Sequence, residues 1–437
     1  MNVHTSPLKM TRPKLQSRNV TVITPDCLLS WLDEGIDRPY LENLDTVVCE
    51  NLELLDESFE LAVSLLLHAT QTLPVRFVGL TTSINDPADL ARWLHVSLEN
   101  LYDFRSSDRD QLLTNESHSF SITHSPALLK AMIKPAHSAL RASISSSDNS
   151  AIVFVPSRSQ CRIVATDLIT ESAIEMDTRG FLGGESNRNI SEEFMDIRLE
   201  KLRDRSLVDG LMHGIGILHD GLLLSDRLLT LELFADGIIR VLVVPRELCW
   251  TLPVRAGLVV VMGTQYMQVT PGHEHDANHN DRNKGPDRKL KNYTIHELVR
   301  MQGLAVRSGK SGRFHLLCQA EEKDTIMRFL EQGLPLESRL ADPDHLDVLQ
   351  AWVARRRQSS SSSYAIRGKQ DGMDMLGFTF LYQRMTHNPV YYDTQLGERD
   401  AKMSRLVDDL FLETAPPPTP AESTAVAGPS HSMATTS

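Results

Sequence analysis

The sequence lacks the features that would place a chain of 437 residues in a specialised class. No run approaches the ~18 uninterrupted apolar residues that a membrane-spanning helix needs, and residues 1–16 contain no hydrophobic signal core. Cysteine is scarce, and the five cysteines are scattered and lie in or beside apolar runs (Cys27, Cys49, Cys161, Cys249 and Cys318). They indicate reduced interior thiols and not a disulfide framework or a zinc site. These observations exclude secreted, membrane-spanning and collagen-like proteins.

Basic residues are also fewer than acidic residues. Lys and Arg number 45 against 57 Asp and Glu, so the formal net charge is −12. This acidic balance argues against non-specific nucleic-acid binding by the protein as a whole, although it permits a local basic channel. Apolar residues make up 41% and charged residues 23% of the chain, which are ordinary globular values. Sizeable cores can therefore form, and the length suggests about three domains.

Short β-rich runs alternate with helical patterns over most of the chain. The early runs are separated by amphipathic segments and lie at residues 20–23, 46–49, 75–80 and 119–123. The later runs are almost continuously apolar and lie at residues 151–155, 238–244, 258–262 and 313–318. Strands that alternate with helices predict parallel β–α–β units, and continuous apolar strands are typical of a parallel sheet covered on both faces.

The patterns divide the chain into three modules between two polar ends. We predict a flexible leader at 1–18 and a disordered tail at 414–437, which is rich in Pro, Ser, Thr and Ala. Between them, two α/β blocks occupy 19–147 and 148–318, and a mostly helical block occupies 319–413. A polar loop at 271–292 contains His273, Glu274, His275 and His279, but it lacks the closed spacing of a metal site. We therefore predict no bound metal.

Short motifs follow several of the predicted strands. In the first block, Thr24 and Pro25 begin a T-P-D motif, residues 48–52 read V-C-E-N-L, and residues 81–83 read T-T-S. In the second block, residues 153–158 read V-F-V-P-S-R, residues 214–221 read G-I-G-I-L-H-D-G, and residues 303–307 read G-L-A-V-R. Further on, residues 377–392 read G-F-T-F-L-Y-Q-R-M-T-H-N-P-V-Y-Y.

With these motifs the chain resembles the superfamily-two DExH (Ski-type) RNA helicases, from about residue 19 to residue 413. The resemblance implies an α/β fold with tandem RecA-like lobes, the first one incomplete, followed by a mostly helical winged-helix domain. Residues 377–392 look like the winged-helix segment of the large two-cassette spliceosomal RNA helicase. Together with residues 156–158 and 247–250, they resemble the C-terminal, degenerate cassette of that helicase more than its N-terminal one.

The residues that would perform ATP hydrolysis are degenerate. Hydrolysis needs a cradle of backbone N–H groups with a Lys, a carboxylate for Mg²⁺ and an arginine on the γ-phosphate. The sequence has no G-x-x-x-x-G-K-[ST] motif; Gly309-Lys310-Ser311 mimics its end, but we expect a polar turn there. Cys49 stands where the resemblance places the Mg²⁺-linked Asp, and a thiol is a poor ligand for a hard cation.

Other positions of the implied site are altered too. Leu52 replaces the His of the DExH box, and Leu304 replaces the first arginine of the G-R-A-G-R segment, while Arg300 replaces a Gln. Glu50 and Arg307 remain as vestiges. We therefore expect no intact catalytic site and no cofactor. The resemblance also makes six residues candidates for a nucleic-acid path: Thr24, Pro25, Thr81, Thr82, Ser157 and Arg158.

The resemblance implies a nuclear, inactive helicase cassette that binds spliceosomal or other ribonucleoprotein proteins in pre-mRNA splicing, with no membrane partner. One alternative stays open: the chain is the C-terminal part of an active ATP-dependent RNA helicase whose P-loop lies outside it, in which case Mg-ATP is the cofactor. A second alternative is RNA binding without hydrolysis, which the charge of −12 makes weaker.

Overall fold

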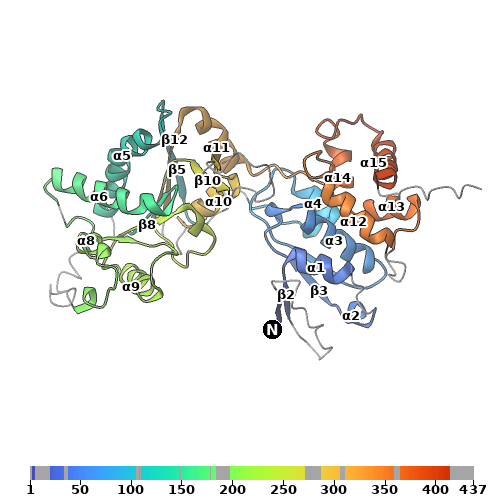
Figure 1. Cartoon of the computed structure of the whole chain (residues 1–437), viewed down its shortest axis with the longest axis horizontal. Coiled ribbons are helices and arrows are strands. Elements are labelled where there is room, and N and C mark those ends of the chain that lie inside the picture. The colour runs from blue at the N-terminus through green and yellow to red at the C-terminus, as the bar shows by residue number, and fades with distance from the viewer. Residues whose placement is uncertain are drawn as a thin grey trace, which may run out of the picture.

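The structure is a computed structural model that describes residues 2–4, 20–33, 38–104, 108, 110–146, 149–177, 179–183, 197–270, 287–305, 311–358 and 365–413. The described elements form two bodies that lie beside each other (Figure 1). One body, which we call the second lobe, is built on a large sheet. The other body combines the first lobe (residues 20–104) with the C-terminal helices. Among the described residues, no helix is both long and apolar enough to cross a membrane.

The second lobe is organised around six parallel strands in the order β5-β12-β9-β6-β8-β7. All residues of β6, β8 and β9 are buried, because helices and loops cover both faces of the sheet. This arrangement confirms the expected α/β fold with a RecA-like sheet. The strands are β5 (Leu113–Phe120), β6 (Ala151–Val155), β7 (Ile215–Ile217), β8 (Val241–Pro245), β9 (Leu258–Met262) and β12 (Gly312–Gln319).

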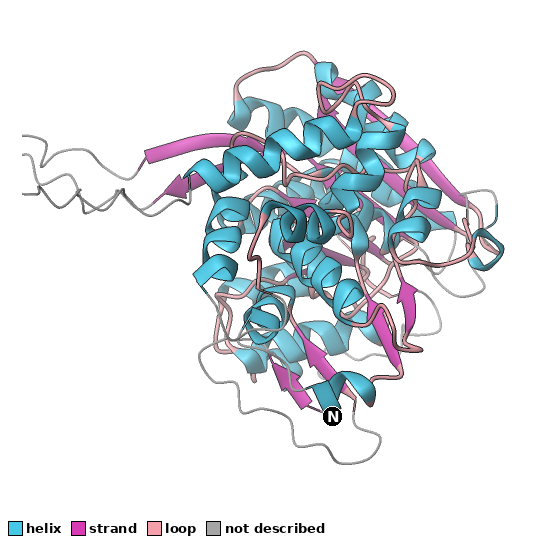
Figure 2. Cartoon of the chain, turned by 90° about the vertical axis from the view of Figure 1, so that its right-hand side faces the viewer, coloured by secondary structure: helices cyan, strands magenta, loops and turns pink. Residues whose placement is uncertain are grey.

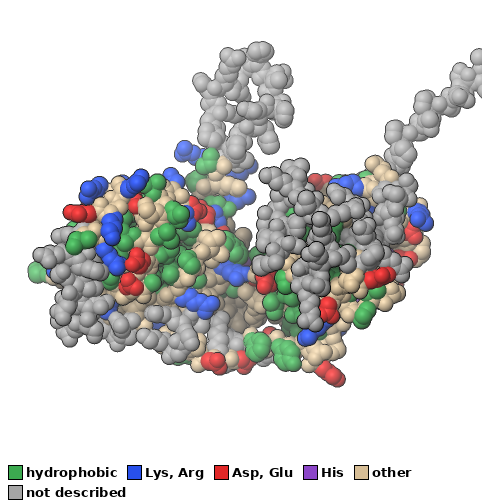
Figure 3. Space-filling view, turned by 90° about the horizontal axis from the view of Figure 1, so that it is seen from below, with side chains coloured by type: hydrophobic (Ala, Val, Ile, Leu, Met, Phe, Trp, Pro, Cys, Tyr) green, Lys and Arg blue, Asp and Glu red, His purple; other side chains and the backbone are tan. Residues whose placement is uncertain are grey.

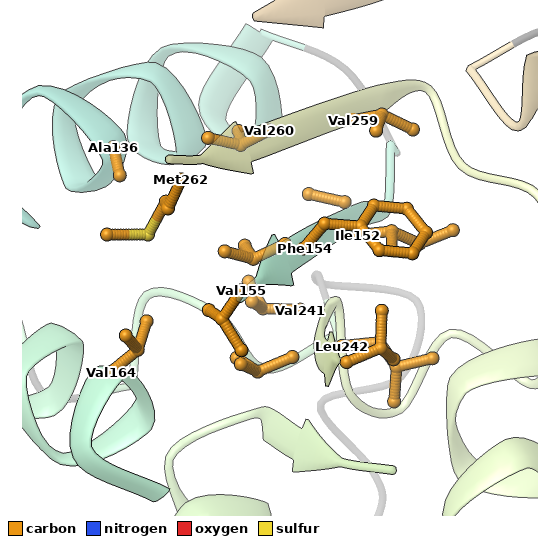
Figure 4. Close-up of a cluster of buried hydrophobic side chains, with 14 of the residues drawn as sticks. Ala136, Ile152, Phe154, Val155, Val164, Val241, Leu242, Val259, Val260 and Met262 are labelled. Carbon is orange, nitrogen blue, oxygen red and sulfur yellow. The ribbon is translucent and has the colours of Figure 1, made fainter. Parts of the chain in front are cut away.

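The core of the second lobe lies between this sheet and its helices. Figure 4 shows Val155 and Met262 on the side of the sheet that faces Ala136 of α5 and Val164 of α6, while Phe154 points to the opposite side. The alternation follows from the two-residue period of a strand. The helices are α5 (Ser125–Ser146), α6 (Arg158–Ile174), α8 (Ser206–Met212), α9 (Leu224–Ala235), α10 (Ile295–Gly303) and α11 (Ala320–Gln332). After β9, the chain forms an antiparallel ribbon of β10 (Gln265–Thr270) and β11 (Asp287–Asn292).

The described strands of the first lobe, together with residues 2–4, form short parallel pairs. β3 (Thr46–Cys49) pairs with β4 (Arg76–Gly79), and β1 (Asn2–His4) pairs with β2 (Thr21–Ile23). Residues 2–4, which lie in the stretch that we expected to be a flexible leader, form β1 and pair with β2. The helices are α1 (Pro25–Asp33), α2 (Arg38–Glu42), α3 (Glu57–Ala69) and α4 (Pro87–Trp93), with short 3-10 turns η2 (Leu52–Leu54) and η3 (Leu98–Asn100).

The C-terminal helices pack directly on the first lobe and share its core. Leu32 of α1 and Leu65 of α3 lie in one apolar cluster with Trp352, Leu381 and Met403. These residues are at most 1% exposed, so the cluster is a true interior. The helices are α12 (Leu346–Gln358), α13 (Lys369–Leu376), α14 (Phe380–His387) and α15 (Arg399–Glu413).

One predicted strand lies in a different lobe from the one we expected. We placed the run at 119–123 in the first block, but β5 begins at Leu113 and pairs with β12 along its whole length. The following helix, α5, contributes Met132 and Leu140 to the core of the second lobe. The segment therefore belongs to the second lobe, because pairing with a distant strand decides sheet membership. The other domain boundaries stay predictions.

Candidate functional site at the cleft between the lobes

A cavity of about 560 Å³ lies between the two lobes. Thr82 and Ser83, which follow β4, line it from the first lobe. Trp250, Arg300 and Leu304 line it from the second lobe, together with the turn after α11. The cavity thus lies where several of the motifs singled out in the sequence meet.

Cys49 ends β3 in the first lobe, is only 5% exposed and belongs to an apolar cluster. Burial raises the pKa of the Cys49 thiol to about 11. At neutral pH the sulfur is therefore protonated and uncharged. Because Mg²⁺ is held by oxygen ligands that are usually charged, the neutral Cys49 thiol is a poor ligand for it.

The residues after Cys49 turn sharply away from the strand. Glu50 is exposed, and Asn51 adopts the left-handed conformation with φ 57°, which a short polar side chain tolerates better than most. Leu52 is 1% exposed and packs in an apolar cluster with Trp93 and Leu94. The correspondence of Leu52 to the histidine of a DExH box stays a prediction.

Arg300 of α10 reaches across the cleft from the second lobe to the first. Its Nη2 donates to the Asn51 side-chain oxygen and lies 3.3 Å from Oε1 of Glu53. Its guanidinium also lies 5.4 Å from the centre of the Trp250 ring. The backbone adds a second link, because Asn85 and Leu334 are joined by an N–H···O bond of 2.9 Å. The two lobes are therefore bridged at the candidate site by protein groups.

Glu53 is a site residue that the sequence did not reveal. Its side chain is 3% exposed, and its Oε2 accepts a hydrogen bond of 3.3 Å from the backbone N–H of Thr82. It therefore links the turn after β3, the turn after β4 and Arg300 of the other lobe. Nearby, burial lowers the pKa of His296 despite the Glu53 charge beside it. The only signal in the sequence is an acidic residue between two leucines, which is too common to be informative.

The remaining positions of the expected site are only partly described. Leu304 follows α10, is half-buried and packs against the core of the second lobe. Arg307, residues 308–310 and the predicted loop around His273, Glu274, His275 and His279 lie outside the described residues. Within the residues that the structure describes, no group of three or more His, Cys, Asp or Glu side chains is arranged to hold a metal ion.

The candidate nucleic-acid residues lie at the carboxyl ends of strands, as predicted from their motifs. Thr24 follows β2 and Pro25 begins α1, where the Thr24 carbonyl accepts from the N–H of Leu28 at 2.9 Å. Thr81 and Thr82 follow β4; Thr81 is exposed and Thr82 is half-buried.

Ser157 and Arg158 lie between β6 and the first turn of α6. The exposed Arg158 lies over Gly221, where an added Cβ would be 2.3 Å from its Nη1. Two sequence motifs, at 153–158 and 214–221, are therefore in contact through the Arg158 side chain. Whether any of these residues touches nucleic acid stays a prediction.

Two lobes that face each other across a cleft, the second with a RecA-like parallel sheet, define a helicase-like protein with a helical C-terminal part. A family model described as a winged helix-turn-helix domain matches residues 361–415. This match confirms the winged-helix domain that we expected in the C-terminal block.

Relatives among the curated proteins match most of the chain. The U5 small nuclear ribonucleoprotein 200 kDa helicase of Homo sapiens is 32% identical over 386 residues, which are 88% of this chain and 16% of that protein. The pre-mRNA-splicing factor brr2 of Schizosaccharomyces pombe is 31% identical over 81% of this chain and 15% of its own length. The activating signal cointegrator 1 complex subunit 3 of Mus musculus is 29% identical over 86% of this chain and 16% of its own length.

The chain is thus a relative of the DExH-box helicases, and the resemblance inferred from its motifs is confirmed. It spans about a sixth of the length of the curated relatives that it matches first. Its likeness to a C-terminal rather than an N-terminal cassette stays a prediction.

Proposed function

We propose that this chain is a helicase-like protein-interaction or regulatory module of pre-mRNA splicing, which does not hydrolyse ATP by itself. The proposal assigns it a nuclear location, ribonucleoprotein partners and RNA as a further ligand. Support comes from the relatives, one of which is named as a U5 small nuclear ribonucleoprotein helicase and another as a pre-mRNA-splicing factor.

The observation that carries the proposal is the protein bridge across the cleft. A hydrolysing site needs a metal ion and cationic side chains directed at phosphate. Here the cation that faces the first lobe, Arg300, is engaged by Asn51 and Glu53. The strand end that would hold the metal carries the neutral thiol of Cys49. Both features favour a cleft held together by its own side chains.

The test is RNA-stimulated ATP turnover by the full chain. We expect turnover at background level, and we expect Glu50→Gln to leave it unchanged. Glu99→Gln, at another exposed glutamate of the first lobe, is the matched control. A turnover that Glu50→Gln abolishes and Glu99→Gln preserves would contradict the proposal. It would instead favour the alternative of a fragment of an active, Mg-ATP-dependent RNA helicase.

RNA binding without hydrolysis is a second candidate, and the exposed Arg158 at the end of β6 favours it. Filter binding of single-stranded RNA over a salt series measures it, since each phosphate contact steepens the fall of affinity with salt. If this candidate is right, Arg158→Ala lowers the salt slope. If RNA is not retained at 50 mM salt, the candidate is wrong.

A further inference from the structure

The ribbon of β10 and β11 projects from the second lobe. Figure 2 shows these two strands extending away from the body, and the same projection stands out in the view of Figure 3. Residue by residue, Gln265 pairs with Asn292 and Thr270 with Asp287. Within the described part of the chain, the outer edges of both strands are unpaired. An edge strand of this kind presents backbone N–H and C=O groups that a further strand can use.

One face of the ribbon is apolar and exposed. Met267 lies opposite Leu290, and Val269 lies two residue pairs further out, opposite Arg288. These side chains are 54%, 52% and 54% exposed, respectively. In an antiparallel pair, residues directly opposite each other share a face, as do residues two apart along a strand. The three side chains therefore form one small apolar surface on a projecting element. Because this surface is exposed, it does not stabilise the fold by burial.

The other face of the ribbon is basic. Lys289 and Lys291 share that face, and Arg288 lies at the far end of the apolar one. All three side chains are exposed. β11 carries three cations against one acidic residue, Asp287, which gives 3 − 1 = +2 and contrasts with the net charge of −12 of the whole chain. The ribbon therefore complements an acidic partner.

The base of the ribbon is held rigidly. Tyr266 packs against Arg246, whose guanidinium carbon lies 3.6 Å from the ring centre. The Gln265 amide donates to Asn292 at 3.0 Å and to Glu322 of α11 at 3.2 Å. An edge that is already fixed in position binds a strand at a lower entropic cost than a flexible loop would.

We propose that the outer edge of β11 binds an extended segment of a protein partner in which apolar and acidic side chains alternate. The segment would continue the ribbon as a third strand through backbone hydrogen bonds. Its apolar side chains would extend the surface of Met267, Val269 and Leu290. Its carboxylates, on the other face, would lie beside Lys289 and Lys291. The inference rests on the proposed function in one respect, since it gives the interaction module a surface.

The ribbon's side chains favour a protein strand over RNA. Binding of single strands usually combines cations with aromatic rings on which bases stack. The exposed apolar face of the ribbon is aliphatic, and the Tyr266 ring is engaged by Arg246. A peptide strand of alternating apolar and acidic residues contacts both faces of the ribbon and forms backbone hydrogen bonds with its edge. A phosphate backbone contacts only the basic side chains.

The experiment measures binding of a fluorescein-labelled eight-residue peptide of alternating Val and Glu to the full chain, by fluorescence anisotropy. Three probes serve as comparisons: the same peptide with alternate backbone nitrogens methylated, an alternating Val and Lys peptide, and a single-stranded RNA octamer. We expect saturable binding of the Val–Glu peptide and at least a tenfold weaker binding of the methylated and Lys peptides, which corresponds to about 1.4 kcal/mol.

Variants of ribbon residues test whether the peptide binds to the ribbon. Lys291→Glu should weaken binding of the Val–Glu peptide about tenfold. Met267→Asp should also weaken it, because this variant removes part of the apolar surface while both lysines stay in place. Lys201→Glu makes the same change of charge at an exposed site beside α8 and should leave binding unchanged. Thermal unfolding of each variant shows whether it is folded, and the ribbon's exposed position predicts that it is.

Each result decides the inference. Equal binding of all peptides, unchanged binding by Lys291→Glu, or binding of the RNA octamer alone would overturn it. ATP turnover measured on the same samples separates this inference from the proposed function. If the peptide does not bind and ATP turnover stays at background level, only the proposed binding surface on the ribbon is refuted. If the peptide binds and ATP turnover depends on Glu50, only the proposal of an inactive cleft is refuted.

Discussion

The substitution Arg384→Met tests how the winged-helix domain is attached to the first lobe. Arg384 of α14 is 5% exposed and is surrounded by carboxylates. Its Nε donates to Glu337 at 2.9 Å, and its Nη1 pairs with Asp89 of α4 and lies 3.2 Å from Asp86. Met fills much of the volume of the Arg stem, so the substitution removes the cation and leaves little cavity.

The expected cost is large because the buried carboxylate of Asp89 and the half-buried carboxylate of Glu337 lose Arg384, although Asp89 keeps an ion pair of 2.7 Å with Arg92. Asp89 is 4% exposed and Glu337 is 14% exposed. Removing one partner of a buried ion pair typically costs about 3–5 kcal/mol, since the remaining charge is buried without compensation. Because Arg92 still compensates part of the Asp89 charge, we expect the free energy of unfolding to fall by up to about this amount at pH 7.

The pH dependence of the loss gives a second check. Burial tends to raise the pKa of Glu337, but the hydrogen bonds from Arg384, Asn388 and Tyr392 outweigh it, so the pKa lies below its ordinary value. A lowered folded-state pKa stabilises the protein above the ordinary pKa near 4.5, and this stability is lost as the pH falls through the folded-state value. The difference between wild type and Arg384→Met should therefore be largest at neutral pH and shrink toward pH 4.

Urea titration followed by circular dichroism at pH 7 and pH 4 measures both quantities. The control is Arg313→Met, which breaks an ion pair of 3.0 Å with Glu116 whose side chains are 33% and 41% exposed. Exposed pairs contribute about 0–1 kcal/mol, so this control should cost little. If Arg384→Met costs no more than Arg313→Met, the attachment of the winged-helix domain does not depend on the buried cation.

Three further predictions concern other parts of the molecule. Burial raises the pKa of Glu60 to about 7 from an ordinary 4.5, so the free energy of unfolding should fall as the pH rises between these values. Glu60→Gln should flatten that fall in urea titrations, and an unchanged pH dependence in the variant would contradict the prediction. Phe154→Ala removes a fully buried ring from the sheet and should cost about 3–5 kcal/mol in the same assay, whereas a loss below about 1 kcal/mol would mean that the sheet repacks. Arg300→Ala should speed hydrogen exchange at the Thr82 amide, which bonds to Glu53, while unaltered exchange would show that the bridge does not hold the cleft.

The parallel core of the second lobe could be predicted because burial on both faces leaves a direct trace in the sequence. The run at 151–155 is apolar at every position and forms β6 with the same bounds, and the run at 258–262 forms β9 likewise. The buried state of Cys49 was predicted from its apolar neighbours in the same way. The location of several motifs at strand ends could also be predicted, because parallel strands have their carboxyl ends at one edge of the sheet.

The composition and order of residues were enough to indicate an α/β fold and a family resemblance, because burial periodicity and motif spacing are local properties of the chain. The damaged hydrolytic site stays a prediction. The assignment of β5 to the second lobe, the packing of the C-terminal helices on α1 and α3, and the bridge from Arg300 to Glu53 are not local. Arg300 and Glu53 are 247 positions apart. Such contacts depend on how whole elements pack, and that packing is a balance of burial and pairing over the entire chain, which no short segment encodes.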